Sequence, residues 1–267
     1  MDGSVSSQYV SGLLFALSTF SQNSFLRVTG ERVSAKYVDM TIKTLADYGV
    51  EIKSEENGFF VRGGQTFKER EYVVEGDWSG AAFPLTLGAI GGAVSLENLN
   101  VNTLQGDAYI LKALALFGAE TLVNEGSVCV KSQTLHACEI DCKDIPDLVQ
   151  ILSVAAAYAK GESVFTNVSR LRYKESDRLQ GILDMLCSAG IAARVEGDAL
   201  IICGGEPQGA AFMPQADHRS VMSCAVLAAC AKGESTIANA QAVGKSYPKF
   251  FQDLKVLGGR ENVRIHR

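Results

Sequence analysis

The distribution of apolar residues separates two kinds of helical segment along the chain. Residues 149–159 and 221–231 are small and apolar on nearly every side, which predicts helices that are buried all round. Four other stretches are amphipathic, namely residues 38–48, 108–117, 178–189 and 248–257. In one of them Ile110, Leu111, Leu114 and Phe117 recur at steps of three and four, as a half-buried helix requires. The pattern therefore predicts central and outer helices.

Short alternating or β-branched runs lie between these helices and predict strands. They are residues 58–62, 93–96, 127–131, 200–203 and 235–238. Both kinds of element alternate along the whole chain, so the pattern predicts an α/β protein.

The same pattern recurs every 70 residues. Asp77, Asp147 and Asp217 are 70 residues apart, and each precedes a small, apolar run. One step earlier lies Ser7, beside Ser6, in a similar run. Asp and Ser are favoured N-caps, because a side-chain oxygen accepts from the free N–H groups of the first helical turn. We therefore predict that these residues begin the central helices.

A second set of positions keeps the same step. Near the start of each amphipathic stretch stand Tyr37, Asp107, Asp177 and Tyr247, and near its end stand Gly49, Gly118, Gly190 and Gly258. Glycine is the usual residue just after a helix because it adopts the left-handed conformation without strain. We predict four α/β repeats of about 70 residues, with sheets and outer helices around a core of nearly parallel buried helices.

Composition and charge limit the classes of function. The chain has 267 residues, 47% of them hydrophobic, and a formal net charge of −5. This charge argues against a general nucleic-acid binder but leaves room for small anionic substrates. The start of the chain has no secretory pattern, and the longest apolar runs are too short to span a bilayer. We expect a soluble, cytoplasmic protein with reduced thiols at its seven cysteines.

Metal and nucleotide motifs are not evident in the sequence. The spacing of His136, Cys138 and Cys142 matches no common zinc pattern, and these residues lie in a strand-like segment, residues 134–140. Gly204-Gly205 follows a predicted strand but does not continue into a dinucleotide-binding motif. We expect no cofactor and no metal.

Several motifs resemble, in order and at similar spacing, those of the 5-enolpyruvylshikimate-3-phosphate (EPSP) synthase family. They are Ser6-Ser7-Gln8, Ile145-Pro146-Asp147, Arg172-Tyr173-Lys174-Glu175-Ser176-Asp177-Arg178-Leu179, Asp217-His218-Arg219 and Gly244-Lys245-Ser246-Tyr247-Pro248. The resemblance covers essentially the whole chain. It implies an enolpyruvyl-transferase-like fold of two lobes, each built from three repeats.

By this resemblance, residues 1–75 are the last repeat of the first lobe and residues 76–267 are the three repeats of the second. The first lobe's two earlier repeats would be absent, together with part of the substrate site. A deliberately shortened chain, a split gene and an incomplete gene model are all open explanations. A separate N-terminal polypeptide would then be a partner, and the isolated chain is expected to turn over substrate negligibly.

The family's reaction joins the enolpyruvyl group of phosphoenolpyruvate to the 5-hydroxyl of shikimate 3-phosphate and releases phosphate. The resemblance implies catalytic roles for Asp147, Glu175 and Lys174. It implies that shikimate 3-phosphate is bound by Ser6, Ser7, Gln8, Ser34, Tyr37, Asp147, Arg170 and Lys174. It implies that phosphoenolpyruvate is bound by Gln8, Arg178, Arg219 and Lys245. His218 is expected to be a structural or electrostatic neighbour.

Each of these residues also has a purely structural interpretation. Ser6, Ser7, Asp77 and Asp147 would serve as plain N-caps, and residues 174–178 would form a solvated charged turn. If residues 174–178 were helical, Lys174 and Arg178 would share one face. The resemblance favours ligand binding for all but Asp77. Helix N-termini bind phosphate, and the planar fork of arginine suits carboxylate and phosphate.

Three other functions remain as alternatives. One is a related transferase that acts on UDP-N-acetylglucosamine, although the residues of the motifs match the shikimate enzyme better. Another is a non-catalytic or partner-dependent fragment. The last is a structural repeat protein, which leaves the cations unexplained.

Four of the implied site residues, Lys174, Arg178, Arg219 and Lys245, are cations from different repeats that should face one cleft. Four cations close together repel one another, so such a cluster is stable only where water, a bound anion or carboxylates such as Glu175 offset the repulsion. We expect Arg178→Ala and Arg219→Ala to leave unliganded stability equal or higher.

Overall fold

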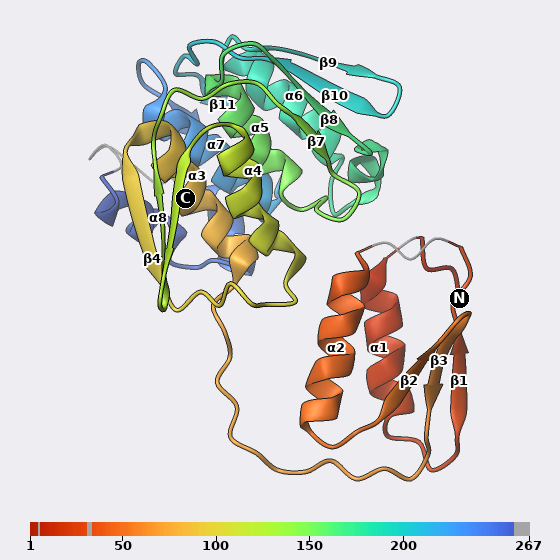
Figure 1. Cartoon of the computed structure of the whole chain (residues 1–267). Coiled ribbons are helices and arrows are strands. Elements are labelled where there is room, and N and C mark those ends of the chain that lie inside the picture. The colour runs from red at the N-terminus through yellow and green to blue at the C-terminus, as the bar shows by residue number, and fades with distance from the viewer. Residues whose placement is uncertain (5, 31–33, 259–267) are drawn as a thin grey trace. The chain divides into compact units, whose positions relative to one another are not determined.

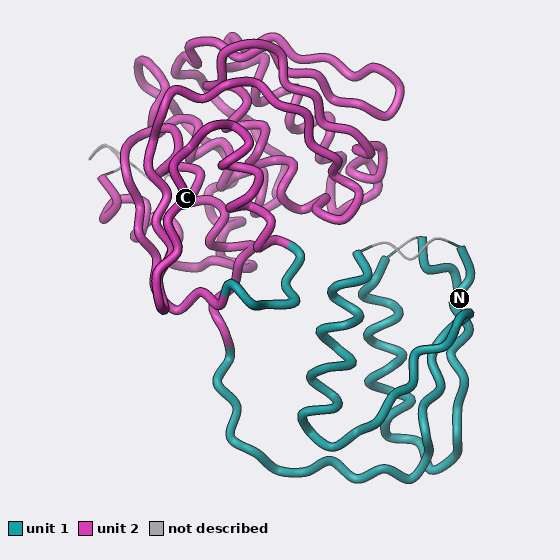
Figure 2. Tube along the Cα trace, viewed as in Figure 1, with its two compact units in different colours: residues 1–74, 101–106 teal, residues 75–100, 107–267 magenta. Residues whose placement is uncertain are grey.

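The structure, a computed structural model, describes residues 1–4, 6–30 and 34–258. The chain divides into two compact units (Figure 2). Unit 1 comprises residues 1–74 and 101–106, and unit 2 comprises residues 75–100 and the chain from residue 107 onward. Each unit has an apolar cluster of its own. No helix in the described ranges is long and apolar enough to cross a membrane.

Unit 1 contains two helices and one small sheet (Figure 1). Helices α1 (Ser7–Leu17) and α2 (Ala35–Asp47) lie side by side. The antiparallel sheet has the order β1 (Ser24–Arg27), β3 (Gly58–Val61), β2 (Ile52–Glu55). The predicted helix at 38–48 and the predicted strand at 58–62 are confirmed within three residues at each end.

Helix α1 buries only one of its sides. Val10 and Leu14 are buried in the core of unit 1. Tyr9, Leu13 and Phe15 are 59%, 40% and 47% exposed. An apolar helix that is covered on one side only has a surface suited to further packing.

Unit 2 contains three copies of one arrangement. In each copy a central helix is followed by a strand, a short 3₁₀ helix and an outer helix. The first copy comprises α3 (Trp78–Gly91), β4 (Ala93–Glu97), η1 (Gly106–Tyr109), α4 (Ile110–Leu116), β5 (Glu120–Asn124) and β6 (Ser127–Lys131). The second comprises β7 (Glu139–Asp141), α5 (Val149–Tyr158), β8 (Glu162–Thr166), η2 (Ser169–Tyr173), α6 (Arg178–Ser188), β9 (Ala192–Glu196) and β10 (Ala199–Cys203). The third comprises β11 (Ala211–Phe212), α7 (His218–Cys230), β12 (Thr236–Ile237), η3 (Ala240–Lys245) and α8 (Phe250–Val256).

The sheets of unit 2 follow the same copies. Their strand orders are β4-β6-β5, β7-β8-β10-β9 and β11-β12. Strand β8 lies between a parallel neighbour, β7, and an antiparallel neighbour, β10. The segment at 134–140, which we expected to be strand-like, forms a strand only at its end, in β7, and a single bridge from His136 to Lys160.

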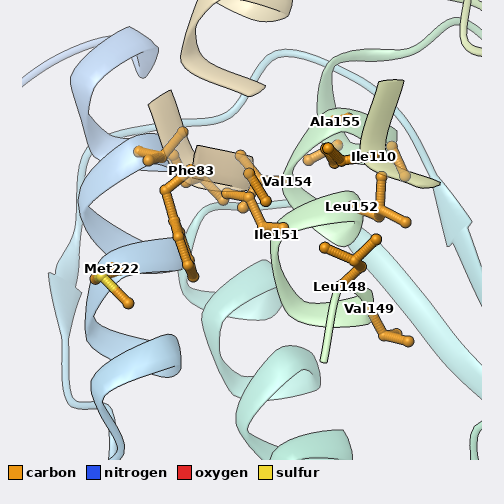
Figure 3. Packing of buried hydrophobic residues seen from close by; sticks show 14 of the residues in the cluster. Phe83, Ile110, Leu148, Val149, Ile151, Leu152, Val154, Ala155 and Met222 are labelled. Carbon is orange, nitrogen blue, oxygen red and sulfur yellow. The ribbon is translucent and has the colours of Figure 1, made fainter. Parts of the chain in front are cut away.

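The central helices α3, α5 and α7 pack against one another, as predicted. Figure 3 shows Phe83 of α3, Ile151 and Val154 of α5 and Met222 of α7 in this core. Nine of the ten residues of α5 are buried. In the outer helix α6 only Arg178, Leu179, Ile182, Met185 and Leu186 are buried. The contrast between all-round and one-sided apolar patterns therefore separated the core from the periphery correctly.

Three of the four predicted N-caps are confirmed. Ser6 accepts from the Gln8 N–H, Asp77 from the N–H groups of Ser79 and Gly80, and Asp217 from the Arg219 N–H. The prediction for Asp147 is wrong. Helix α5 begins at Val149 after Leu148, which makes no side-chain cap, because the Asp147 carboxylate is drawn to cations instead.

Candidate functional site

A cluster of ion pairs lies where α5, α6 and α7 begin, and Arg178 is at its centre. Arg178 is the first residue of α6 and is 2% exposed. Its Nε donates to Asp217 Oδ2 at 2.9 Å, its Nη1 to Asp147 Oδ1 at 2.6 Å and its Nη2 to Glu175 Oε2 at 2.8 Å. Three of the five guanidinium N–H groups are thus used by carboxylates.

Asp147 connects Arg178 to two further cations. Lys174 Nζ lies 3.4 Å from Oδ1 of Asp147, and Arg219 Nη2 lies 3.6 Å from its Oδ2. Burial alone would raise the pKa of Asp147, but the charges of Arg219, Lys174 and Arg178 outweigh burial and lower this pKa to about 2. The carboxylate is therefore ionised at neutral pH, which a general base requires.

Lys174 and Arg178 do not lie on one helix, so they do not share a helix face. Lys174 follows η2 in extended conformation, and the helix begins four residues later at Arg178. The Asp177 side chain caps α6 at the Gln180 N–H and so keeps the preceding residues out of the helix. Lys174 and Arg178 meet at Asp147 through the turn between them, not through helical spacing.

Glu175 connects the second and third copies of the repeat. Its carboxylate contacts Arg178, and its Oε1 lies 3.7 Å from Lys245 Nζ at the end of η3. Burial acts to raise the pKa of Glu175, but a hydrogen bond from its own backbone and the charges of Arg178 and Lys245 lower it. The four cations expected in one cleft are thus joined through Asp147 and Glu175.

The expectation that Arg178 could be removed without loss of stability is corrected by this geometry. Three carboxylates converge on a buried guanidinium, and its removal would leave their charges uncompensated. Arg219 differs, because it is 14% exposed and makes only long contacts, of 3.5 and 3.6 Å, to Asp147.

Sequence reasoning missed Asp217 as a partner of Arg178. Besides capping α7, its carboxylate accepts from Arg178 Nε and from the Ser176 hydroxyl at 3.0 Å. The 70-residue step was the available signal, because it makes Asp217 the equivalent of Asp147. Its neighbour His218 is largely buried, and burial and Arg219 lower its pKa, so the imidazole is neutral at pH 7.

Arg170 lies in η2, four residues before Lys174. Its guanidinium donates to the Lys143 carbonyl in the loop before Asp147, rather than to a carboxylate. The predicted residues of unit 1 lie at or near the N-terminal ends of α1 and α2. Ser7 and Ala35 line one small hollow there, Ser34 adopts a left-handed φ of 52°, and Tyr37 lies in the first turn of α2.

Cysteine and histidine do not gather into a metal site in the part of the chain that the structure describes. Burial raises the pKa of Cys138 to about 11 and that of Cys142 to about 12, so both thiols are protonated at neutral pH.

Similarity to solved structures defines the class of fold. The enolpyruvyl transferase NikO from Streptomyces tendae matches 94% of this chain with a TM-score of 0.74, at 16% sequence identity. An EPSP synthase from Acinetobacter baumannii matches 95% of this chain and 61% of its own, with a TM-score of 0.81 and 27% identity. The chain therefore has the enolpyruvyl-transferase fold.

Sequence comparison identifies the family. The family model described as EPSP synthase (3-phosphoshikimate 1-carboxyvinyltransferase) matches residues 1–254. The 3-phosphoshikimate 1-carboxyvinyltransferase of Clostridium acetobutylicum is 40% identical over 261 residues, which is 97% of this chain and 60% of the relative. That of Methanopyrus kandleri is 39% identical over 257 residues. The chain belongs to the EPSP synthase family and spans about 60% of the length of these curated relatives.

Proposed function

We propose that the chain forms part of an enzyme that transfers the enolpyruvyl group of phosphoenolpyruvate to the 5-hydroxyl of shikimate 3-phosphate and releases phosphate. The observation that carries this proposal is the junction of Lys174, Arg178, Arg219 and Lys245 through the carboxylates of Asp147 and Glu175. Both substrates are anions, and the reaction moves protons at a hydroxyl and at a carbon. It therefore needs cations beside ionised carboxylates.

The residues of unit 2 divide into catalytic and binding roles. Asp147, held ionised by its cations, is the candidate base at the substrate hydroxyl. Glu175 and Lys174 are the candidates for the remaining proton transfers and for stabilising the charge of the intermediate. Arg219 and Lys245 would bind phosphoenolpyruvate, and both are more accessible than Arg178. Arg178 contributes charge and its two remaining N–H groups.

The residues of unit 1 are proposed to hold shikimate 3-phosphate. Ser6, Ser7 and Gln8 stand at the N-terminal end of α1, where free N–H groups and hydroxyls suit phosphate. Ser34 and Tyr37 lie at the start of α2 and would contribute to the same substrate, together with Arg170 and Lys174 from unit 2. Gln8 would contact both substrates.

The isolated chain is proposed to need further polypeptide for activity. Residues 1–75 would be one repeat of a first lobe and residues 76–267 a second lobe of three repeats. The relatives are longer, and α1 exposes Tyr9, Leu13 and Phe15 on a face that its counterparts in unit 2 bury. Further repeats of the same kind, in a partner polypeptide, would cover that face and complete the substrate site.

Phosphate release from phosphoenolpyruvate and shikimate 3-phosphate tests the proposal. We expect negligible turnover by the chain alone, because losing several site groups costs orders of magnitude in rate. Adding the missing N-terminal part of a relative should restore turnover. In this complemented enzyme Glu175→Gln should abolish turnover. The control variant Arg194→Gln, which changes an exposed residue of β9, should leave turnover unchanged. Turnover with UDP-N-acetylglucosamine instead, or none with any addition, would contradict the proposal.

A further inference from the structure

The turn that connects η2 to α6, residues 174–177, carries two of the proposed catalytic side chains. Lys174 Nζ lies 3.4 Å from the Asp147 carboxylate, and Glu175 Oε2 lies 2.8 Å from Arg178 Nη2. Among the described residues, the N–H groups of this turn donate to no backbone carbonyl. A backbone without such bonds does not fix its own path, so side chains decide where Lys174 and Glu175 are held.

Ser176 attaches the turn to helix α7. Its hydroxyl donates to Asp217 Oδ2 at 3.0 Å. Asp217 is the N-cap of α7, and its side chain is 1% exposed. The same Oδ2 accepts from Arg178 Nε at 2.9 Å, and Oδ1 accepts from the Arg219 N–H at 2.8 Å. Asp217 is thus held by groups from α6 and from α7, and it offers Ser176 a fixed acceptor.

Neither capping nor charge compensation explains the hydroxyl of Ser176. The N-cap of α6 is the next residue, Asp177, which accepts from the Gln180 N–H at 3.0 Å. The charge of Asp217 is already paired with Arg178, and that contact would persist without Ser176. A neutral donor adds no charge to the cluster, but its hydrogen bond has a direction. The hydroxyl therefore fixes position.

We propose that Ser176 is a positioning residue, whose hydroxyl fastens the 174–177 turn to Asp217 and thereby keeps Lys174 at Asp147 and Glu175 between Arg178 and Lys245. The catalytic part of this inference rests on the proposed function. Two other residues of the turn already connect it to α5 and to η3, through Lys174 and Glu175. Ser176 adds the connection to α7, so the turn is tied to each of the elements that carry the other site residues.

The titration of Glu175 reports whether the turn stays in place. Burial raises the pKa of Glu175, whereas a hydrogen bond from its own backbone and the charges of Arg178 and Lys245 lower it, and Asp217 raises it slightly. The net effect is a lowered pKa. A turn released from Asp217 would let the carboxylate move away from both cations into water, and its pKa would rise toward that of an ordinary glutamate.

Carbon-13 NMR of the glutamate carboxyls, measured against pH on the full chain, tests the proposal without any ligand. The Glu175 signal is assigned by its loss in Glu175→Gln. We expect Ser176→Ala to raise the pKa of Glu175 and Ser176→Thr, which keeps a hydroxyl, to retain the wild-type pKa. Ser188→Ala is the matched control, because it removes an exposed hydroxyl of α6 that donates to the Asp184 carbonyl at 2.8 Å.

Kinetics of the complemented enzyme test the catalytic consequence. Ser176→Ala should lower kcat per folded molecule about tenfold to a hundredfold, because a small displacement of catalytic groups is costly in rate. Its KM for phosphoenolpyruvate should stay within about twofold, because Arg219 and Lys245 are unchanged. Ser176→Thr should restore kcat. A merely structural residue would instead lower the urea midpoint of the chain, followed by Trp78 fluorescence, and leave kcat per folded molecule intact.

The proposal is overturned if Ser176→Ala leaves the pKa of Glu175 unchanged, if this variant fails to fold, or if an active complemented enzyme keeps its full kcat. If the pKa shifts as expected but the complemented wild-type enzyme transfers no enolpyruvyl group, the proposed function fails, whereas the positioning of Glu175 by Ser176 stands.

Discussion

Helix α1 of unit 1 and helix α5 of unit 2 occupy the same place in the 70-residue repeat but differ in how much they bury. In α5 nine of ten residues are buried. In α1 only Ser7, Val10 and Leu14 are buried. Both helices are apolar, so composition alone does not account for the difference. The neighbours of each helix do, since α5 packs against α3 and α7, whereas α1 packs against α2 and β1.

The same contrast extends to charge. Unit 2 buries Arg178 among three carboxylates. In unit 1, Asp47 forms ion pairs with Lys43 and Arg70, and both cations are exposed. A closed core of three helices can hold a desolvated ionic cluster at its end, whereas a single repeat leaves its charges in water.

The chain's single tryptophan, Trp78, is fully buried on α3 and therefore reports the unfolding of unit 2 by fluorescence.

The largest effect is expected from removing the central cation of unit 2. Arg178→Met should destabilise unit 2 by about 3–5 kcal/mol, because three carboxylates are left near one another without their shared partner. Arg70→Met in unit 1 should cost about 0–1 kcal/mol, because its pair is exposed. Urea unfolding followed by Trp78 fluorescence measures unit 2, and amide exchange in α2 measures unit 1. Similar small losses for both variants would show that the Arg178 cluster is not a structural centre.

A smaller effect is expected from core packing. Leu152→Ala in α5 should cost about 3 kcal/mol, because the side chain is fully buried between helices and its loss leaves a cavity. Leu13→Ala in α1 should cost about 0.5 kcal/mol, because Leu13 is already 40% exposed. The same unfolding and exchange measurements apply. If a polypeptide that supplies the missing repeats is added, the cost of Leu13→Ala should rise, whereas that of Leu152→Ala should not.

Periodicity was sufficient to predict the central and outer helices, and it placed five of the strands, β3, β4, β6, β10 and β12. The all-round apolar pattern of residues 149–159 and the one-sided pattern of residues 178–189 correctly separated a central from an outer helix. The glycine at the end of α6 is explained by the same local logic. Gly190 has a φ of 75°, which lets the Ile191 N–H reach the Leu186 carbonyl. These are interactions between residues close in sequence, so a local pattern contains them.

The motifs named most residues of the ion-pair cluster of unit 2, but not Asp217 and not the pairing among them. The motifs named Asp147 and Arg178, but the sequence indicated a capping role for Asp147 because that is the role its equivalents play. Whether an aspartate caps a helix or binds an arginine depends on which cations the other repeats bring near it. Arg178 and Arg219 are 31 and 72 residues away from Asp147 in sequence. Such competition is decided by tertiary packing, which no local pattern records.

The smallest expected effect concerns the N-caps that the two units share. Ser6→Ala and Asp77→Ala each remove a side-chain acceptor from the first turn of a central helix, and each should cost about 1 kcal/mol. Asp77 should cost more than Ser6, because its carboxylate accepts from two N–H groups and interacts with the helix dipole. Amide exchange in α1 and Trp78 fluorescence in α3 measure the two losses, and Ser6→Asp and Asp77→Asn are controls that keep a capping oxygen.

Because Ser6 is also a proposed ligand of shikimate 3-phosphate, binding of that ligand to the complemented enzyme separates its two roles. If Ser6→Ala weakens binding but leaves exchange in α1 unchanged, the hydroxyl serves the ligand alone and the cap is not a stabilising contact in unit 1.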